Sequence, residues 1–268
     1  MKVQNKTIVV TGGGNGMGRQ LVLQLLNKGA RVAAVDLNAQ FLEETKQLAG
    51  QHAERLSLHE LNISDKTSVD LLPDAVVKAH GSVDGLINNA GIIQPFVRIQ
   101  NLNFEAIERV MNVNFYGSLY MIKAFLPHLL NRPEAHIVNI SSMGGFLPVP
   151  GQSIYGASKA AVKLMTEGLY AELKNTPVKV TIVFPGAINT QITANSGLEM
   201  PNMSKDTSSI KMMDADKAAE MMINAMEKNK FRICVGSDSS MMDLLYRISP
   251  KFATNLIAKK MGQLLGSA

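Results

Sequence analysis

The sequence has no tryptophan and one cysteine among its 268 residues, and it has no long apolar run. The single cysteine, Cys234, excludes an internal disulfide framework and is compatible with a reducing compartment. No segment approaches the roughly 18 consecutive apolar residues that a membrane-spanning helix needs. Residues 1–6 lack the pattern of a secretory signal peptide. Together these absences predict a cytoplasmic protein.

Clustered charge is also absent. The formal net charge is +5, but the basic residues are scattered and form no run of about five or six. This distribution argues against nucleic acid as a partner. We expect no metal site. The chain length fits one large α/β domain with a substantial core.

Short apolar segments alternate with longer segments of helical period. The predicted strands are 7–10, 31–35, 56–61, 83–89, 135–140, 178–184 and 231–235. The predicted helices are 18–28, 41–49, 65–79, 104–130, 153–174 and 216–227. This alternation predicts an α/β fold, a Rossmann-type doubly wound sheet of seven parallel strands with helices on both faces. It forms a single domain over residues 1–237, in which the irregular stretch 187–213 is expected to be a substrate loop.

Residues 238–268 form a basic, helical C-terminal extension. Its apolar residues recur at helical spacing, at Ala253, Leu256, Ile257, Met261, Leu264 and Leu265. Its basic residues are Arg247, Lys251, Lys259 and Lys260. Such an amphipathic helix can rest on a membrane surface. Packing on its own domain or on a neighbouring subunit is the favoured interpretation.

A glycine-rich turn at residues 11–18 joins the first predicted strand to the first helix. Gly12, Gly16 and Gly18 allow a tight turn and a close approach of a pyrophosphate. The start of the helix offers free N–H groups and the positive end of its dipole. The position of the turn between a strand and a helix therefore indicates a dinucleotide site.

Asp36 ends the second strand, twenty residues beyond Gly16. A carboxylate there accepts hydrogen bonds from ribose hydroxyls and repels a 2′-phosphate, so NAD is favoured over NADP. Asn15 and Leu37 offer no positive charge, whereas Arg19 is close enough in sequence to reach the rim of the pocket.

Tyr155 and Lys159 stand four residues apart on a predicted helix, so they share a face. The ammonium is expected to lower the pKa of the phenol toward neutral pH. Ser142 can hold a carbonyl oxygen, and the adjacent Ser141 should face the other way on an extended segment. With a dinucleotide site in the same chain, this group indicates hydride-transfer chemistry.

Taken together, these motifs resemble the short-chain dehydrogenase/reductase family over roughly residues 5–236. The resemblance rests on the glycine turn, on Asn62-Ile63-Ser64-Asp65, on Asn88-Asn89-Ala90-Gly91, on Asn114 and Ser142, on the Tyr-x-x-x-Lys motif of Tyr155 and Lys159, and on Pro185-Gly186 followed by Thr190.

The resemblance implies a role for each of these residues. The catalytic group would be Asn114, Ser142, Tyr155 and Lys159, with Asn114 holding a water in a proton relay to Lys159. The cofactor would contact Gly12, Gly14, Asn15, Gly16, Met17, Gly18, Asp36, Leu37, Asn62, Ile63, Asp65, Asn89, Ala90, Gly91, Tyr155, Lys159, Pro185, Gly186, Ile188 and Thr190. Asp65 would reach the adenine amino group. The substrate would contact Ile93, Ser142, Met143, Phe146 and Tyr155.

The expected function is that of an NAD(H)-dependent oxidoreductase that interconverts a secondary alcohol and a ketone on a fairly hydrophobic small molecule. Two alternatives stay open. One is a 3-oxoacyl-thioester reductase that uses NADPH, and the other is a cofactor-binding regulatory or scaffold protein. The segments 104–130 and 153–174 resemble the family's dimer-forming helices, which predicts a homodimer or homotetramer.

Overall fold

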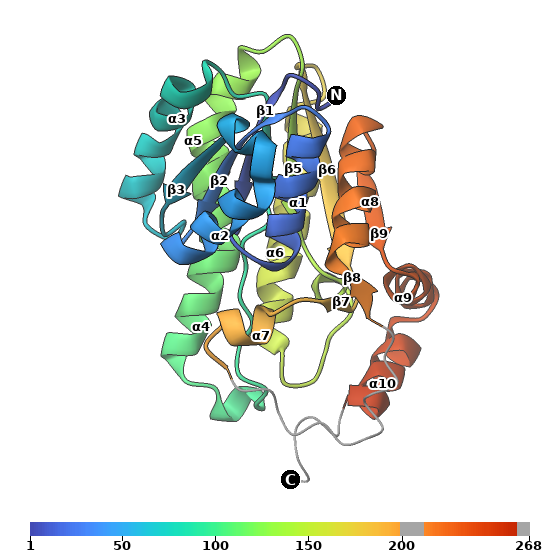
Figure 1. Cartoon of the computed structure of the whole chain (residues 1–268). Helices are drawn as coiled ribbons and strands as arrows, with labels where there is room; N and C mark the ends of the chain where they lie inside the picture. The colour runs from blue at the N-terminus through green and yellow to red at the C-terminus, as the bar shows by residue number, and fades with distance from the viewer. Residues whose placement is uncertain (199–211, 262–268) are drawn as a thin grey trace.

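The computed structural model of the chain describes residues 1–198 and 212–261 (Figure 1). Seven parallel strands form one sheet in the order β3-β2-β1-β4-β5-β6-β9. The strands are β1 Thr7–Thr11, β2 Arg31–Asp36, β3 Leu56–Glu60, β4 Gly85–Asn88, β5 Ala135–Ile140, β6 Val178–Pro185 and β9 Arg232–Val235. The predicted seven-stranded parallel sheet is therefore confirmed, and the chain order reverses between β1 and β4.

Helices cover both faces of this sheet (Figure 1). One face carries α1 Gly16–Asn27, α2 Ala39–Ala49 and α8 Ala215–Glu227, and the other carries α3 Lys66–His80, α5 Ser118–Leu130 and α6 Ser153–Glu172. Successive strand side chains point to opposite faces. In β1, Ile8 and Val10 accordingly pack with the first group of helices and Val9 with the second. Apolar residues at every position of a strand are what a sheet covered on both faces requires.

The helix predicted over 104–130 is not a continuous α-helix. It consists of α4 Phe104–Met111, a π-helical turn η3 Asn112–Gly117, and α5. The turn contains two Asn, one β-branched Val and one Gly, which all have weak helix propensity. A side chain built on Gly117 would meet the Cδ1 atom of Ile63 at 2.7 Å. The interruption lies at the position of Asn114, which the sequence marks as functional.

The stretch 187–213 contains short elements that the sequence did not predict. It begins with β7 Ile188–Asn189 and α7 Ile192–Asn195 and ends in β8 Met213–Asp214. The strands β7 and β8 pair in parallel as a separate small sheet. Residues 199–211 of the predicted substrate loop lie outside the described residues.

Two helices follow the last strand, α9 Ser237–Ile248 and α10 Pro250–Met261. Ala253 and Ile257 of α10 pack with Leu147 and Met242, so this part of the predicted apolar face packs on the protein's own domain, as one of the favoured interpretations expects. Residues 264 and 265 of that face lie outside the described residues.

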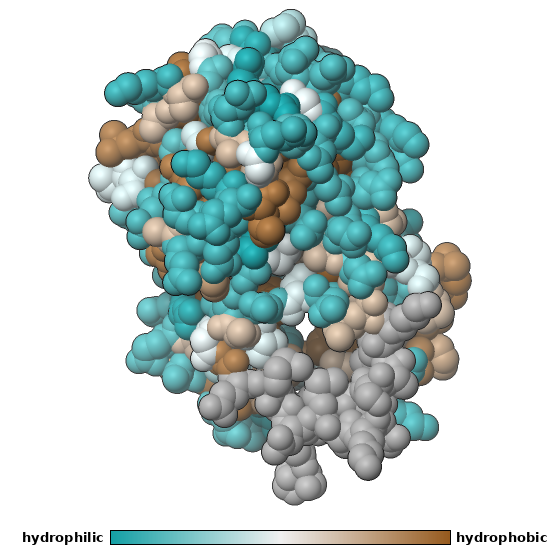
Figure 2. All heavy atoms as spheres, viewed as in Figure 1, coloured by the Kyte–Doolittle hydropathy of each residue, from teal (hydrophilic) through white to brown (hydrophobic). Residues whose placement is uncertain are grey.

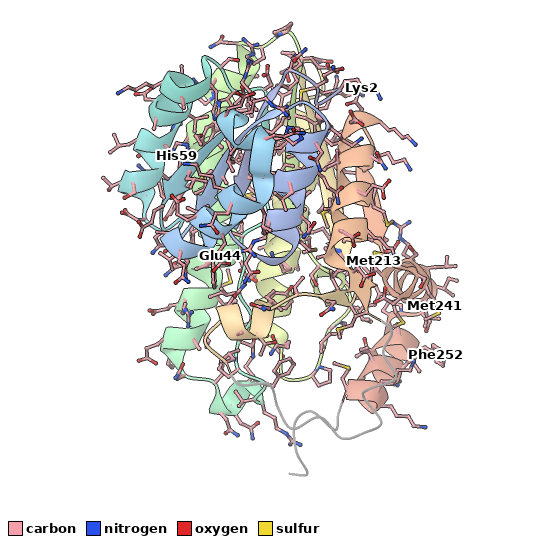
Figure 3. All side chains as sticks on the ribbon, in the orientation of Figure 1. Lys2, Glu44, His59, Met213, Met241 and Phe252 are labelled. Atoms are coloured by element: carbon pink, nitrogen blue, oxygen red, sulfur yellow. The ribbon has the colours of Figure 1, made fainter. Side chains whose placement is uncertain are left out.

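The opposite, outer side of these helices is exposed. Figure 3 shows Met241 and Phe252 projecting away from the sheet, and Figure 2 shows hydrophobic surface over α9. Each of the two side chains is 57% exposed. Within residues 1–198 and 212–261, no helix has the length and apolarity needed to cross a bilayer.

Candidate active site

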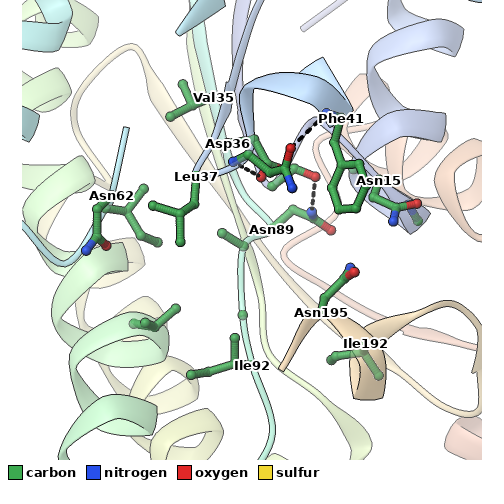
Figure 4. A pocket seen from close by; sticks show the side chains of 18 of the residues that line it. Asn15, Val35, Asp36, Leu37, Phe41, Asn62, Asn89, Ile92, Ile192 and Asn195 are labelled. Carbon is green, nitrogen blue, oxygen red and sulfur yellow. Dashed lines mark hydrogen bonds between the residues drawn. The ribbon is translucent and has the colours of Figure 1, made fainter. Parts of the chain in front are cut away.

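A cavity of about 900 Å³ opens at the carboxyl ends of the central strands (Figure 4). It lies where β1 and β4 adjoin, the switch point at which open α/β sheets bind ligands. Figure 4 shows Asn15, Asp36 and Phe41 on one side of the cavity, with Ile192 and Asn195 of α7 on another. The predicted cofactor residues that line it are Gly12, Asn15, Gly16, Met17, Gly18, Asp36, Leu37, Asn62, Ile63, Asn89, Ala90, Gly91 and Thr190.

Other predicted cofactor residues do not line this cavity, namely Gly14, Asp65, Tyr155, Lys159, Pro185, Gly186 and Ile188. The cavity also has walls that sequence reasoning missed, including Asn38, Gln40, Phe41, Glu60, Arg109, Val113, Gln191, Ile192, Ala194 and Asn195. Most of these follow a strand end or lie in α7, and no local motif distinguishes them.

The glycine turn fits a dinucleotide because side chains would obstruct it. Gly12 and Gly16 have φ angles of +66° and +52°, in the left-handed region that favours glycine. A Cβ on Gly18 would lie 1.8 Å from the carbonyl oxygen of Gly12, so the helix start packs directly on the turn. The Asn15 side chain accepts from the Gly16 N–H at 2.7 Å and caps α1. The remaining free N–H groups of that helix start are suited to a pyrophosphate.

Asp36 is held against the turn by backbone hydrogen bonds. Its Oδ2 atom accepts from the Gly14 N–H at 2.9 Å, and its Oδ1 atom accepts from the Asn38 N–H at 3.1 Å. The Arg19 guanidinium, in contrast, is bound to Glu44 at 2.7 Å and to the Gly14 carbonyl at 2.8 Å, and it does not line the cavity. The Asp36 carboxylate therefore lies at the cavity wall, whereas the Arg19 guanidinium does not.

Asp65 has a local structural role in addition to the one that the resemblance implies. It caps α3, where its carboxylate accepts from the Thr67 N–H at 3.0 Å and from the Ser68 hydroxyl. These two bonds leave acceptor capacity on the carboxylate, so the adenine contact implied for Asp65 stays a prediction. Ile63 and Ser64, just before it, line the cavity in its place.

Ser142 and Tyr155 meet beside a short turn, η4 Met143–Gly145. A Cβ on Gly144 would lie 3.3 Å from the Tyr155 ring and 3.4 Å from the Ser142 Oγ atom, so both side chains border the same glycine. The Ser142 Oγ atom also accepts from the Gly144 N–H at 3.0 Å, which fixes its position beside the phenol ring. Ser141 is buried, and its hydroxyl donates to the Lys159 carbonyl at 2.8 Å, away from Tyr155. Two serines that are adjacent in sequence thus have separate roles.

Asn114 and Lys159 both lie beside Gly91. A Cβ on Gly91 would lie 3.0 Å from the Lys159 Nζ atom and 3.2 Å from the Asn114 Oδ1 atom. Asn114 is fully buried and bonds both the N–H and the C=O of Ile92, each at 2.9 Å. Because Gly91 itself lines the cavity, Asn114 and Lys159 border the cofactor pocket, and none of the four predicted catalytic residues forms its lining.

The pKa values around Tyr155 differ from the expectation. Burial raises the pKa of Tyr155, and the hydrogen bond from Ser142 opposes that rise. Burial lowers the pKa of Lys159 to about 8, and its ammonium donates to the Ile140 carbonyl at 3.0 Å. Burial therefore dominates the pKa of Tyr155 in the protein alone, and the lowering expected from the Lys159 ammonium stays a prediction. Tyr155 is a neutral phenol at neutral pH, ready to donate a proton.

Comparison with known proteins places this arrangement in a family. A model of the short chain dehydrogenases matches residues 6–201. The chain belongs to the short-chain dehydrogenase family. The SadH oxidoreductase of Mycobacterium tuberculosis is 35% identical over 262 residues, which cover 95% of each chain. The 1-deoxy-11-beta-hydroxypentalenate dehydrogenase of Streptomyces avermitilis is 31% identical over 242 residues, 89% of this chain and 87% of that enzyme.

Solved structures of short-chain dehydrogenases share the fold. One from Burkholderia phymatum in complex with NAD has a TM-score of 0.85 at 24% identity and covers 94% of this chain and 96% of its own. One from Burkholderia cenocepacia in complex with NADP has a TM-score of 0.81 at 25% identity, with coverage of 96% and 99%. The chain is thus an oxidoreductase acting on CH–OH groups, and these likenesses do not select between the two cofactors.

In this dehydrogenase the segment after β6 is fixed by α9. The N–H of Gly186 donates to Val235 at 2.8 Å, and the N–H of Ala187 donates to Asp238 at 2.7 Å. Ile188 packs on the sheet core, which explains why it does not line the cavity. Thr190 lies 3.5 Å from a Cβ position on Gly16, so the segment closes over the glycine turn.

The predicted substrate residues lie against the C-terminal helices of the dehydrogenase. Met143 and Phe146 pack on the cluster of Leu147, Met242 and α10. The Phe146 ring centre is 5.4 Å from that of Phe184 and 6.2 Å from that of Tyr246. Ile93 is held by its N–H, which donates to Ser196 at 3.0 Å. Sequence reasoning did not place α9 and α10 beside these residues.

Proposed function

We propose that this enzyme is an NAD(H)-dependent oxidoreductase that interconverts a secondary alcohol and a ketone on a fairly hydrophobic substrate. The observation that carries the proposal is the convergence of Ser142, Tyr155, Lys159 and Asn114 around two glycines, at the edge of a cavity suited to a dinucleotide. Neither the cavity nor the four side chains would indicate this chemistry alone.

The side chains divide the work on the substrate oxygen. A bound nicotinamide supplies or accepts the hydride. Tyr155 gives a proton to the developing alkoxide in reduction and removes the hydroxyl proton in oxidation. Ser142 donates to the same oxygen and orients it, because its hydroxyl lies beside the phenol. Lys159, with a pKa near 8, and the buried Asn114 stand behind Tyr155 as its route for proton exchange.

The choice of NAD rests on Asp36. Its carboxylate lines the cavity and is fixed by two backbone N–H groups, so it can accept from ribose hydroxyls and repels a 2′-phosphate. Arg19, the basic residue that was expected at the rim, is paired with Glu44. Arg109 of α4 does line the cavity, and its contribution is included in the cofactor test below.

A hydrophobic substrate is supported by the residues next to Ser142. Met143 and Phe146 are partly buried apolar side chains in contact with other apolar groups, and Ile93 lies on the segment opposite. The Streptomyces relative is, by its name, a dehydrogenase of a hydroxylated compound.

We also propose a homodimer or homotetramer located in the cytoplasm. The two helices that resemble the family's dimer-forming pair expose large apolar side chains, Phe104 at 77% and Leu164 at 70%. Apolar side chains exposed to that extent on neighbouring helices are suited to a subunit interface. Light scattering on the purified protein measures the assembly directly.

One experiment separates the three functions. The purified protein is mixed with NAD or NADP and a panel of secondary alcohols, and separately with NADH or NADPH and a panel of ketones and 3-oxoacyl thioesters. The absorbance of the reduced cofactor is followed in each mixture. We expect faster turnover with NAD. Turnover confined to NADPH with 3-oxoacyl thioesters would identify the reductase. Cofactor binding without turnover of any alcohol or ketone would identify a regulatory protein and overturn the proposal.

A further inference from the structure

The helix that carries Tyr155 begins without a cap of its own. The residue before α6, Gln152, makes no side-chain hydrogen bond to the first turn. The first N–H groups of a helix have no partner within the helix, so something else must accept from them. Here the acceptor lies far away in sequence.

That acceptor is Gln94, in the segment that follows the cofactor-lining Gly91. Its Oε1 atom accepts from the N–H of Ile154 at 2.8 Å and from the N–H of Tyr155 itself at 2.9 Å. The sequence separations are 60 and 61 residues. An N-cap side chain normally bonds these same positions from the adjacent residue.

Gln94 cannot turn away from this position. It is 1% exposed, and its Nε2 atom donates to the Gly151 carbonyl at 2.9 Å, which leaves Oε1 facing the helix. The backbone carbonyl of Gln94 accepts from the Gln152 side-chain amide at 2.8 Å. Three hydrogen bonds therefore fix the neutral carboxamide of Gln94, and a fourth fixes its backbone carbonyl, against the start of α6.

The same short segment reaches the other parts of the site. Ile92 is bonded through both backbone groups to Asn114, and Ile93 is bonded to Ser196 beyond α7. Ile92 thus contacts both the cofactor cavity and the proposed proton relay, Ile93 contacts the residue after α7, and Gln94 contacts the helix of Tyr155.

We infer that Gln94 is a positioning residue for Tyr155, setting the start of α6 so that the phenol lies beside Ser142 and the nicotinamide end of the cavity. The inference rests on the proposed function, in which Tyr155 is the proton donor and acceptor. A neutral amide suits this position, because it satisfies two N–H groups and adds no charge next to a group that must form a phenolate.

The surroundings of Tyr155 make the effect of charge testable. Within the described residues, α6 contributes the Lys159 ammonium, whereas residues 143–145 and residues 92–94 contribute no ionisable side chain. A carboxylate in place of the Gln94 amide would be the first negative charge on that segment. It would disfavour the phenolate.

The test uses Gln94→Met, which keeps the length and removes the polar atoms, and Gln94→Glu, which keeps an acceptor and adds charge. Amide hydrogen exchange at Ile154 and Tyr155 is measured by NMR. The titration of Tyr155 is measured as the tyrosinate absorbance that is lost in Tyr155→Phe. Asn103→Ala is the control, because it removes an equivalent carboxamide cap, bonded to Ala106 at 2.8 Å, from α4.

Gln94→Met should speed exchange at both amides and lower kcat roughly ten- to hundredfold, with NADH affinity unchanged. Gln94→Glu should keep the amides protected and move the Tyr155 titration to higher pH. Asn103→Ala should lower only the melting temperature. Unchanged exchange in Gln94→Met, or faster exchange with an unchanged Tyr155 titration and kcat, would overturn the inference. If the wild type oxidises no alcohol, the proposed function fails, while exchange and titration still decide the role of Gln94.

Discussion

The two ends of the active site are built in opposite ways. The nucleotide end, residues 11–18 and 36–41, relies on backbone groups and on glycines, and the bond between Asp36 and Gly14 spans 22 positions. The proton-transfer end, Asn114, Ser142, Tyr155 and Lys159, relies on side chains held by distant residues, such as Asn114 and Ser158 at a separation of 44.

The difference in burial has an energetic consequence. Asn114 is fully buried and Lys159 is 4% exposed, whereas Leu37 at the nucleotide end is 68% exposed. Buried polar groups stabilise a fold only while every partner is in place. A substitution at the proton-transfer end should therefore change both stability and rate, and one at the nucleotide end should change chiefly which cofactor binds.

The largest effect is expected from Tyr155→Phe, which removes the proton-transferring hydroxyl. We expect kcat to fall roughly a thousandfold, about 4 kcal/mol in the barrier, with NADH affinity unchanged. Tyr170→Phe is the control, since Tyr170 lies on the same helix and stacks on Phe231 at 4.2 Å. Steady-state kinetics and NADH fluorescence titration measure the two quantities. Retained activity would show that another group moves the proton, and the comparison would fail.

The next effect is expected from Asn114→Ala. The change removes the three hydrogen bonds of 2.9 Å that the Asn114 side chain makes. Two of them join it to the N–H and the C=O of Ile92, and the third joins it to the Ser158 hydroxyl. We expect a loss of about 3 kcal/mol in the free energy of unfolding, together with lower activity. Asn112→Ala, an exposed position in the same π-helical turn, should change little. Urea denaturation distinguishes them, and equal losses would contradict the role given to Asn114.

Lys159→Met should change stability in the opposite direction from Asn114→Ala. It should remove activity but stabilise the fold. The pKa of Lys159 falls from 10.5 to about 8 on burial. Burial therefore destabilises the charged form in the folded protein by about 3 kcal/mol. Loss of the bond to the Ile140 carbonyl offsets about 1 kcal/mol of that gain. We therefore expect a net stabilisation of about 2 kcal/mol at pH 7.

The pH dependence of that gain follows from its cause. Between the folded pKa near 8 and the unfolded value of 10.5, the unfolded chain binds more protons than the folded one. The wild type thus becomes more stable relative to Lys159→Met as pH rises through this window. Unfolding curves at pH 7 and at pH 9.5 measure the change, with Lys163→Met on the same helix as control. If the difference in stability between Lys159→Met and the wild type is the same at both pH values, the buried charge is not its source.

The comparison also explains what the sequence could predict. The glycine turn and Asp36 lie within short segments that determine their own geometry, so motif and fold together placed them correctly at the cavity. The seven strands followed from apolar runs in the same way. For Asp65, sequence reasoning did not predict that the carboxylate also caps α3 through Thr67 and Ser68.

Contacts between distant segments were beyond the reach of the sequence. Gln94 has no motif, and its role depends on the fold bringing residue 94 to residue 155. The raised pKa of Tyr155 depends on how deeply the ring is packed, which spacing alone does not give. The packing of α10 against Leu147 likewise required the tertiary fold.

The smallest effect is expected at the nucleotide end, from Asp36→Ala. The bond from the buried Gly14 N–H is partly buried and the bond from the Asn38 N–H is exposed, so water replaces the second acceptor and stability should fall by about 1 kcal/mol. Preference for NAD over NADP should fall about tenfold, since both the acceptor for ribose hydroxyls and the charge that repels a phosphate are gone. The control is Glu60→Ala, the carboxylate that pairs in register with Asp36 and also lines the cavity. Ratios of kcat/KM for the two cofactors measure the change. If Glu60→Ala shifts the ratio as much as Asp36→Ala, overall charge selects the cofactor and Asp36 has no special contact with it; if neither does, Arg109 becomes the residue to replace next.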